Sequence, residues 1–226
     1  MTIVLAIETS TPACSVALNL GDRVISRYSE EPRSHTRLVM SMVDEVLTEA
    51  GIKVTSINGL AVTLGPGSFT GLRIGFAAVQ GLAFGLDLPV VAISTLQVMA
   101  ETAVRKRGLG DEMVIVPVLD ARMGEFNCGC YQLESNGHLS PMQDDQLLNT
   151  KGALQLINRY KHCVVVGEAI GLELPKFIDV YPDALDLLKI AEQGFAKGLA
   201  QPIDEIELVY LRGADAWQKR KRIRAS

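Results

Sequence analysis

Residues 3–22 read IVLAIETSTPACSVALNLGD. The chain begins with two apolar runs, at 2–7 and 14–20, and a polar turn separates them. Both runs have the composition of buried strands. Gly21-Asp22 is a hairpin signal, so we expect residues 23–29 to return as a third strand. Three strands joined by short turns, at the start of a chain that then becomes helical, indicate an α/β fold.

Two helices are expected next. Apolar residues at 35–50 recur at helical spacing and form one stripe, with Ser34 as the expected N-cap and Gly51 as the expected C-cap. The stretch GPGSFTGLRIG at 65–75 then leads into a glycine-rich helix over 70–85. Small residues four apart in that helix would let another backbone come close, either in a sheet or in a second chain.

The second half of the chain repeats the opening by topology. After a boundary at 106–110, a strand, a turn and a second strand are expected again, followed by a helix, a strand and a last helix. We expect one domain at 1–107, with 206–226 packing back on it, and another at 108–205. The expected elements of the second half are strands at 113–119, 125–133 and 162–166 and helices at 150–159 and 182–199.

The composition is that of an ordinary globular protein. The chain has 226 residues, of which 48% are hydrophobic and 21% charged, and a formal net charge of −4. No run of 18 consecutive apolar residues occurs and the opening lacks a basic start, so we expect a cytoplasmic protein without a membrane span. Five of the 22 basic residues lie at 219–224. This tail predicts contact with RNA or an acidic partner, unless it is only a solvated helix end.

Polar side chains follow the first strand of each half. Glu8, Thr9 and Ser10 follow one strand, and Asp120 opens the matching turn of the second half. A pair of such turns facing each other across a cleft can hold a metal-bound phosphate, as in a nucleotide site. The alternative is that these side chains only stabilise their turns by hydrogen bonds. The loop at 65–75 matches neither the Walker A motif nor the dinucleotide fingerprint, so close packing of helix and sheet is the alternative to phosphate binding there.

The sequence indicates no catalytic residue and no metal site. The three histidines, His35, His138 and His162, are isolated in the sequence. The four cysteines lack zinc spacing, and burial as small apolar side chains is the favoured reading for them. Ser68 follows glycines but has no evident histidine partner, so a serine nucleophile is disfavoured.

Together these motifs resemble the TsaB (YeaZ) family over the whole chain. In two places the sequence departs from the family pattern. Glu8 stands where the family commonly has aspartate, and the longer carboxylate would crowd a metal–phosphate pocket. Val209 stands where a proline is usual. The motifs that carry the resemblance are residues 3–11 with 15–18, 65–75, 119–125 and Tyr210-Leu-Arg212.

The resemblance implies an α/β fold of the actin-like ATPase (ASKHA) type, duplicated as two β-β-β-α-β-α-type subdomains. It implies a non-catalytic scaffold that binds TsaD, the catalytic subunit forming threonylcarbamoyladenosine beside the anticodon of tRNA, with the ATPase TsaE joining them. Contact with tRNA would be indirect, and the chain would form a homodimer when TsaD is absent. No cofactor would be required. Binding of ATP or ADP in the cleft stays open, as does a stand-alone ATP-dependent or glycoprotease-like enzyme.

The resemblance also implies which surface binds the partner. In the family, the two helices that correspond to 35–50 and 70–85 form a helical bundle with TsaD or with a second TsaB. The first helix has an apolar residue, Met40, outside its main stripe, and the second has its row of small residues. The residues predicted to contribute to the interface are Leu38, Met42, Leu72, Phe76 and Val79.

Overall fold

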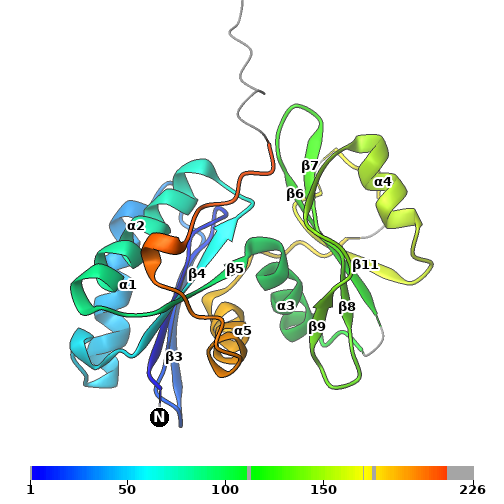
Figure 1. Ribbon diagram of the computed structural model, residues 1–226. Helices are drawn as coiled ribbons and strands as arrows, with labels where there is room; N and C mark the ends of the chain where they lie inside the picture. Colours follow the sequence, from blue (N-terminus) through cyan, green and yellow to red (C-terminus); the bar gives the residue numbers. More distant parts are fainter. Residues whose placement is uncertain (1, 111–112, 170, 175–176, 213–226) are drawn as a thin grey trace, which may run out of the picture.

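The structure is a computed structural model that describes residues 2–110, 113–169, 171–174 and 177–212. It has two lobes, each built on one β-sheet (Figure 1). The basic residues at 219–224, for which we expect contact with RNA or an acidic partner, lie outside the described residues.

The first sheet has five strands in the order β3-β2-β1-β4-β5. β1 pairs antiparallel with β2 and parallel with β4, which places the two strands of the opening sequence at the centre of the sheet. The strands are β1 (Val4–Glu8), β2 (Cys14–Asn19), β3 (Val24–Ser29), β4 (Gly59–Gly65) and β5 (Val90–Ser94).

Helices cover both faces of this sheet. Two helices lie side by side on one face, and a third covers the other (Figure 1). Along β1, Leu5 and Ile7 point to the first face, while Val4 and Ala6 point to the second. Burial on both faces explains why the opening run is apolar throughout rather than alternating. The helices are α1 (His35–Ala50) and α2 (Phe69–Leu86) on the first face and α5 (Ala184–Ala196) on the second.

The second sheet repeats this arrangement. Its strand order is β10-β7-β6-β8-β9, with β11 parallel to β6. β7 and β8 pair with β6 in one continuous register, so together they form the single strand expected at 125–133. The pairing is interrupted opposite Pro117 of β6, because proline has no N–H to donate. The elements are β6 (Val114–Asp120), β7 (Glu125–Cys128), β8 (Tyr131–Leu133), β9 (Leu139–Pro141), β10 (Gln146–Asn149), α4 (Thr150–Asn158) and β11 (Cys163–Gly167).

In each half the first strand pairs antiparallel with the strand that follows it, and the strand after the next helix (β4 after α1, β11 after α4) pairs parallel with that first strand. This confirms the predicted duplicated α/β fold of the actin-like ATPase type. Helix α3 (Thr95–Arg107) lies between the two lobes, since Val98 packs toward the first sheet and Met99 toward the second.

The predicted domain boundary is wrong for the last helix. We expected 108–205 to form the second domain, but α5 packs on β1, β2 and β5 of the first sheet. The first-sheet face that receives it carries small side chains, including Ala6, Ala17 and Ala61, which let the helix approach closely. The second lobe therefore ends before α5, and the chain returns to the first lobe before residue 206.

Of the two helix caps predicted for 35–50, the structure confirms Gly51 but not Ser34. Gly51 ends α1 with a φ of 70°, as predicted, and at the start of α2 the Ser68 side chain accepts a hydrogen bond from the Gly71 amide. Ser34 makes no capping bond, because its hydroxyl donates to the Glu31 carbonyl oxygen instead. Two short 3₁₀ helices, η1 (Val54–Ser56) and η2 (Ile203–Glu205), complete the described elements.

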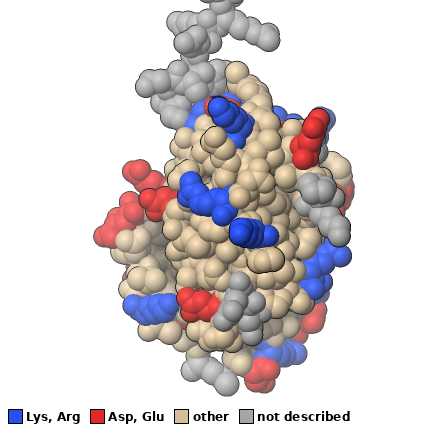
Figure 2. Space-filling model, turned by 90° about the vertical axis from the view of Figure 1, so that its right-hand side faces the viewer, with Lys and Arg blue, Asp and Glu red and all other residues tan. Residues whose placement is uncertain are grey.

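Two further sequence expectations concern cysteines and membrane spans. Cys14, Cys128 and Cys130 are free and buried, as predicted, and Cys163 is half-buried. Helix α2 is long and apolar enough to cross a membrane by length and composition alone, a test that core helices of soluble proteins also pass. Here α2 packs on β4 within the first lobe. On the face of the second lobe seen in Figure 2, basic and acidic side chains are interspersed with uncharged surface.

Candidate functional site

A cleft of about 1180 Å³ lies between the two lobes. The residues that line it include Ser10, Gly67, Asp120 and Glu168, which lie at or just beyond the carboxyl ends of β1, β4, β6 and β11. The carboxyl edge of parallel strands is where α/β folds bind ligands. The cleft is therefore the first candidate site, and segments of both lobes form its walls.

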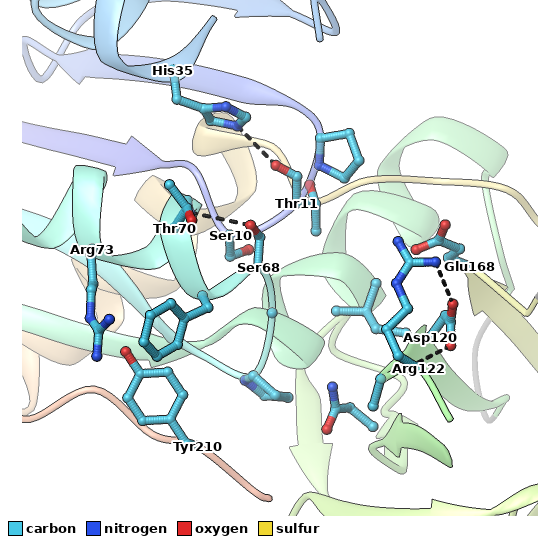
Figure 3. Close-up of a pocket in the computed structure, with 18 of the residues that line it drawn as sticks. Ser10, Thr11, His35, Ser68, Thr70, Arg73, Asp120, Arg122, Glu168 and Tyr210 are labelled. Carbon is cyan, nitrogen blue, oxygen red and sulfur yellow. Dashed lines mark hydrogen bonds and ion pairs between the residues drawn. The ribbon is translucent and has the colours of Figure 1, made fainter. Parts of the chain in front are cut away.

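The turn after β1 is held together by its own side chains. The Glu8 carboxylate accepts hydrogen bonds from the amide and the hydroxyl of Ser10, each at 2.5 Å, and Glu8 is fully buried. Burial raises the pKa of Glu8, although the hydrogen bonds from Ser10 oppose this. His35 at the start of α1 braces the same turn, since its Nε2 lies 2.9 Å from the Thr11 carbonyl oxygen (Figure 3).

The glycine-rich loop packs directly against this turn. The Ser68 amide donates to the Ser10 carbonyl oxygen at 2.7 Å, and the Thr9 hydroxyl donates to the Gly71 carbonyl oxygen at 2.8 Å. A Cβ at Gly71 would overlap the Thr9 carbonyl oxygen, and Cβ atoms at 67 and 75 would overlap Ser10 and Thr9. These glycines therefore serve close packing, the alternative to phosphate binding that the sequence left open.

The opposite wall belongs to the second lobe and carries charge. Asp120 accepts hydrogen bonds from the Arg122 amide at 2.8 Å and from its guanidinium at 3.0 Å. Glu168 lies beside this pair (Figure 3). Partial burial and the Asp120 charge raise the pKa of Glu168, and Arg122 opposes that shift. This wall therefore combines two carboxylates with one guanidinium.

The rim on the first lobe is aromatic. The rings of Phe69 and Tyr210 lie 5.5 Å apart between centroids, and the Arg73 guanidinium lies 3.4 Å above the Phe69 ring. Phe69 is 58% exposed and Tyr210 is 41% exposed. The cluster joins the first turn of α2 to the segment that follows η2 near the carboxyl end of the chain.

The residues predicted to form a nucleotide site are only partly brought together. Ser10 and Asp120 line the same cleft from opposite lobes, as the facing turns implied. Glu8 and Thr9 lie beneath the surface at 0% and 2% exposure and do not line it. Within residues 2–110, 113–169, 171–174 and 177–212, no three His, Cys, Asp or Glu side chains gather as metal ligands do.

The residues predicted to bind a partner divide into two groups. Leu38 and Phe76 are half-buried on α1 and α2. Met42, Leu72 and Val79 are 6%, 1% and 0% exposed inside the first lobe. A side chain without exposed surface offers nothing to a partner, so the prediction is wrong for these three. They lie on the core-facing side of their helices, which periodicity alone did not separate from the outer side.

Sequence reasoning missed several cleft residues. Glu168 could have been found, because it directly follows the strand β11, just as Glu8 and Asp120 are the last residues of β1 and β6. Tyr210 and Arg212 belong to a motif that carries the family resemblance but does not by itself predict a place in the cleft. Nothing in the sequence indicates that Phe69 and Arg122 line a cleft, because a single aromatic residue or arginine in a turn is common.

Comparison with known proteins gives a consistent result. The family model described as TsaD, tRNA N6-adenosine threonylcarbamoyltransferase, matches residues 27–167. The chain is 38% identical over 227 residues to the tRNA threonylcarbamoyladenosine biosynthesis protein TsaB of Escherichia coli K12. That alignment covers 96% of this chain and 97% of the relative.

Solved structures agree with this. A Pseudomonas aeruginosa protein described as similar to peptidase YeaZ superposes with a TM-score of 0.83 at 34% identity, covering 94% of this chain and all of the other. YeaZ from Pseudomonas aeruginosa superposes with a TM-score of 0.78 at 33% identity, covering 93% of this chain and all of the other.

Proposed function

The chain belongs to the TsaB family of tRNA threonylcarbamoyladenosine biosynthesis proteins, and on that premise we propose that it is a non-catalytic subunit of the modifying complex. In this proposal it binds and supports a TsaD-type catalytic subunit directly. A TsaE-type ATPase joins the two proteins, and tRNA is contacted through the complex. The family match supports the pathway, and the surface of α2 supports the role within it.

The exposed face of α2 is the observation that carries this proposal. The helix has 18 residues and a single charged side chain, Arg73. From Arg73, exposed positions continue at Ala77, Gly81 and Phe84, which follow one stripe at helical spacing. Phe84 is 66% exposed, and a Cβ at Gly81 would meet nothing within 4 Å. An apolar stripe with small residues at its centre suits close packing against a helix of another chain.

Helix α1 extends this surface. It lies beside α2 on the same face of the sheet, and Met40 is 47% exposed (Figure 1). We therefore place the partner interface on the outer side of the two helices, at Met40, Ala77, Gly81 and Phe84. Leu38 and Phe76 border it as half-buried residues.

The test is co-purification of the chain with the TsaD-type protein of the same cell, using Gly81→Arg. A long cation in the stripe would hold the two helices apart, so the recovered partner should fall at least tenfold. Ala196→Arg is the matched control, because Ala196 is also exposed but lies on α5, across the sheet. Full recovery with Gly81→Arg, from a folded variant, would contradict the proposal.

We propose that this role requires no nucleotide in the chain's own cleft. Support comes from Glu8, whose carboxylate is bound to Ser10 and does not line the cleft, and from the glycine loop packed against the same turn. Titration calorimetry of the isolated chain with ATP and Mg²⁺ should give no binding heat. Micromolar binding with hydrolysis would instead favour the stand-alone ATP-dependent enzyme.

We further propose that two copies associate through the same stripe when the partner is absent. Light scattering of the isolated chain should then give a dimer mass that becomes a monomer mass in Gly81→Arg. Adding the TsaD-type protein should replace the homodimer by a heterodimer. A dimer that survives Gly81→Arg would place self-association on a different surface.

A further inference from the structure

The segment at 207–212 crosses the mouth of the cleft from the first lobe to the second (Figure 1). It follows η2, which packs in the core of the first lobe through Ile203. It contains the Tyr210-Leu-Arg212 motif, which the proposed function does not use. We call this segment the clasp.

The clasp is fixed to the first lobe at two points. The Val209 amide donates to the Leu64 carbonyl oxygen of β4 at 2.9 Å, and a Cβ at Gly65 would lie 2.5 Å from the Val209 carbonyl oxygen. Gly65 also has a φ of 111°, so a side chain there would be strained as well as crowded. Tyr210 then packs on Phe69 of α2.

Arg212 fixes the other end of the clasp to the second lobe. Its Nη2 donates to the carbonyl oxygens of Ala121 at 3.0 Å and Arg122 at 3.1 Å, and it pairs with the Glu125 carboxylate at 2.5 Å. Its Nη1 lies 3.3 Å from the sulfur of Met123. One guanidinium thus contacts four of the five residues at 121–125, the turn between β6 and β7.

That turn has an unfavourable backbone conformation. Arg122, Met123 and Gly124 have φ values of 68°, 60° and 73°, so three consecutive residues adopt the left-handed conformation. For a residue with a side chain this conformation is unfavourable, and it persists only where surrounding contacts impose it. The Arg212 hydrogen bonds to carbonyl oxygens inside the turn are such contacts.

Among the described residues, the lobes are also joined through α3 and Asp145. Helix α3 packs into both sheets, and Asp145 accepts hydrogen bonds from Ser94 at 2.5 Å and Tyr131 at 3.0 Å. Rotation about this junction would open the mouth of the cleft. We propose that the clasp is a conformational latch, in which Arg212 holds the mouth closed and keeps the turn at 121–125 in its left-handed form.

Hydrogen exchange on the full chain tests the latch. In Arg212→Ala, the amides of Ala121, Arg122 and Glu125 should exchange at least tenfold faster than in the parent protein. Amides of β1 and β6 should exchange at unchanged rates, because the lobe cores do not depend on the clasp. Unchanged exchange at 121–125 would overturn the proposal. Faster exchange throughout the core would overturn it too, because Arg212 would then stabilise the whole fold.

Arg27→Ala is the matched control. Like Arg212, Arg27 forms ion pairs with carboxylates of another element, here Glu45 and Glu49 on α1. Its side chain is 32% exposed, against 26% for that of Arg212. It lies wholly within the first lobe, so its loss should leave exchange at 121–125 unchanged. A conservative variant, Arg212→Lys, keeps the charge but lacks the several N–H donors of the guanidinium. Its amides at 121–125 should exchange at a rate between those of the parent protein and Arg212→Ala.

The latch also connects to the partner, and this step rests on the proposed function. Tyr210 packs on the first turn of α2, so a partner on α2 should restrain the clasp through Phe69. Binding of the TsaD-type protein should therefore slow exchange at 121–125 in the parent chain but not in Tyr210→Ala. Equal slowing in both would overturn this coupling. If no partner binds, the proposed function is contradicted. The hydrogen-exchange comparison of the isolated parent chain with Arg212→Ala still tests the latch in that case.

Discussion

At the scale of single residues, Glu8 places an ionisable group in the core of the first lobe. Its carboxyl group is fully buried, one oxygen accepts two hydrogen bonds from Ser10, and the other is among the buried polar atoms without a hydrogen-bond partner in the described chain. Burial without a counter-charge at bonding distance disfavours ionisation. This is the physical reason why the native state raises the pKa of Glu8.

The raised pKa predicts a pH-dependent stability. The native state binds a proton at Glu8 more tightly than the unfolded chain does, so the free energy of unfolding falls as pH rises above the unfolded pKa of about 4.5. Glu8→Gln removes this titration and keeps an acceptor for the Ser10 amide. Urea unfolding between pH 4.5 and 8 should show the variant gaining stability relative to the parent as pH rises. An unchanged difference across that range would contradict the prediction, and Glu207→Gln, at an exposed site, is the control.

At the scale of elements, α2 has two different faces that both contain glycine. Gly71 and Gly75 lie on the inner face, where the turn after β1 leaves no room for a Cβ. Gly81 and Gly85 lie on the outer face, where a Cβ would meet nothing within 4 Å. Glycine weakens a helix, so those on the outer face lower the stability of the free chain without any gain in its own packing. The partner proposed to pack against them would supply the missing reason.

Two substitutions in the same helix test this distinction. Gly81→Ala should raise the free energy of unfolding by about 0.5–1 kcal/mol, because alanine favours the helix and meets no neighbour. Gly71→Ala should lower it by about 2–3 kcal/mol, because its Cβ overlaps the Thr9 carbonyl oxygen of the backbone. Urea unfolding of both variants provides the measurement. Changes of the same sign would mean that the two faces do not differ in this way.

At the scale of the whole molecule, the chain closes on itself through α5. After the second lobe is complete, α5 returns to the open face of the first sheet, and the clasp then crosses back over the cleft. An ion-pair network fixes this return. Arg105 of α3 bonds Asp183 and Asp186 at the start of α5, at 2.8 Å each.

The network predicts that replacing Arg105, a partly exposed side chain, strongly lowers the free energy of unfolding. Asp183 and Asp186 are 5% and 1% exposed, so Arg105→Ala would leave two buried carboxylates without their main partner. We expect the free energy of unfolding to fall by about 2–3 kcal/mol. Arg37→Ala, which breaks an exposed pair with Glu31, should cost less than about 1 kcal/mol. Equal losses in denaturant unfolding would show that burial of the aspartates does not matter here.

The local elements and the family follow from the amino-acid sequence alone. Apolar period and turn residues predicted β1 to β3, α1 with its Gly51 cap, and the repeat of that order in the second half, because these depend on neighbours along the chain. The glycine loop and the motifs around it predicted the family that the comparisons show.

The remaining features of the fold and of the cleft depend on tertiary packing. This packing buries Met42, Leu72 and Val79 in the core, returns α5 to the first sheet and brings Arg212 to the turn at 121–125. Each of these depends on contacts between residues far apart in sequence. Periodicity marks a helix face as apolar but does not say whether its own sheet or another chain covers it, and only packing in three dimensions separates the two.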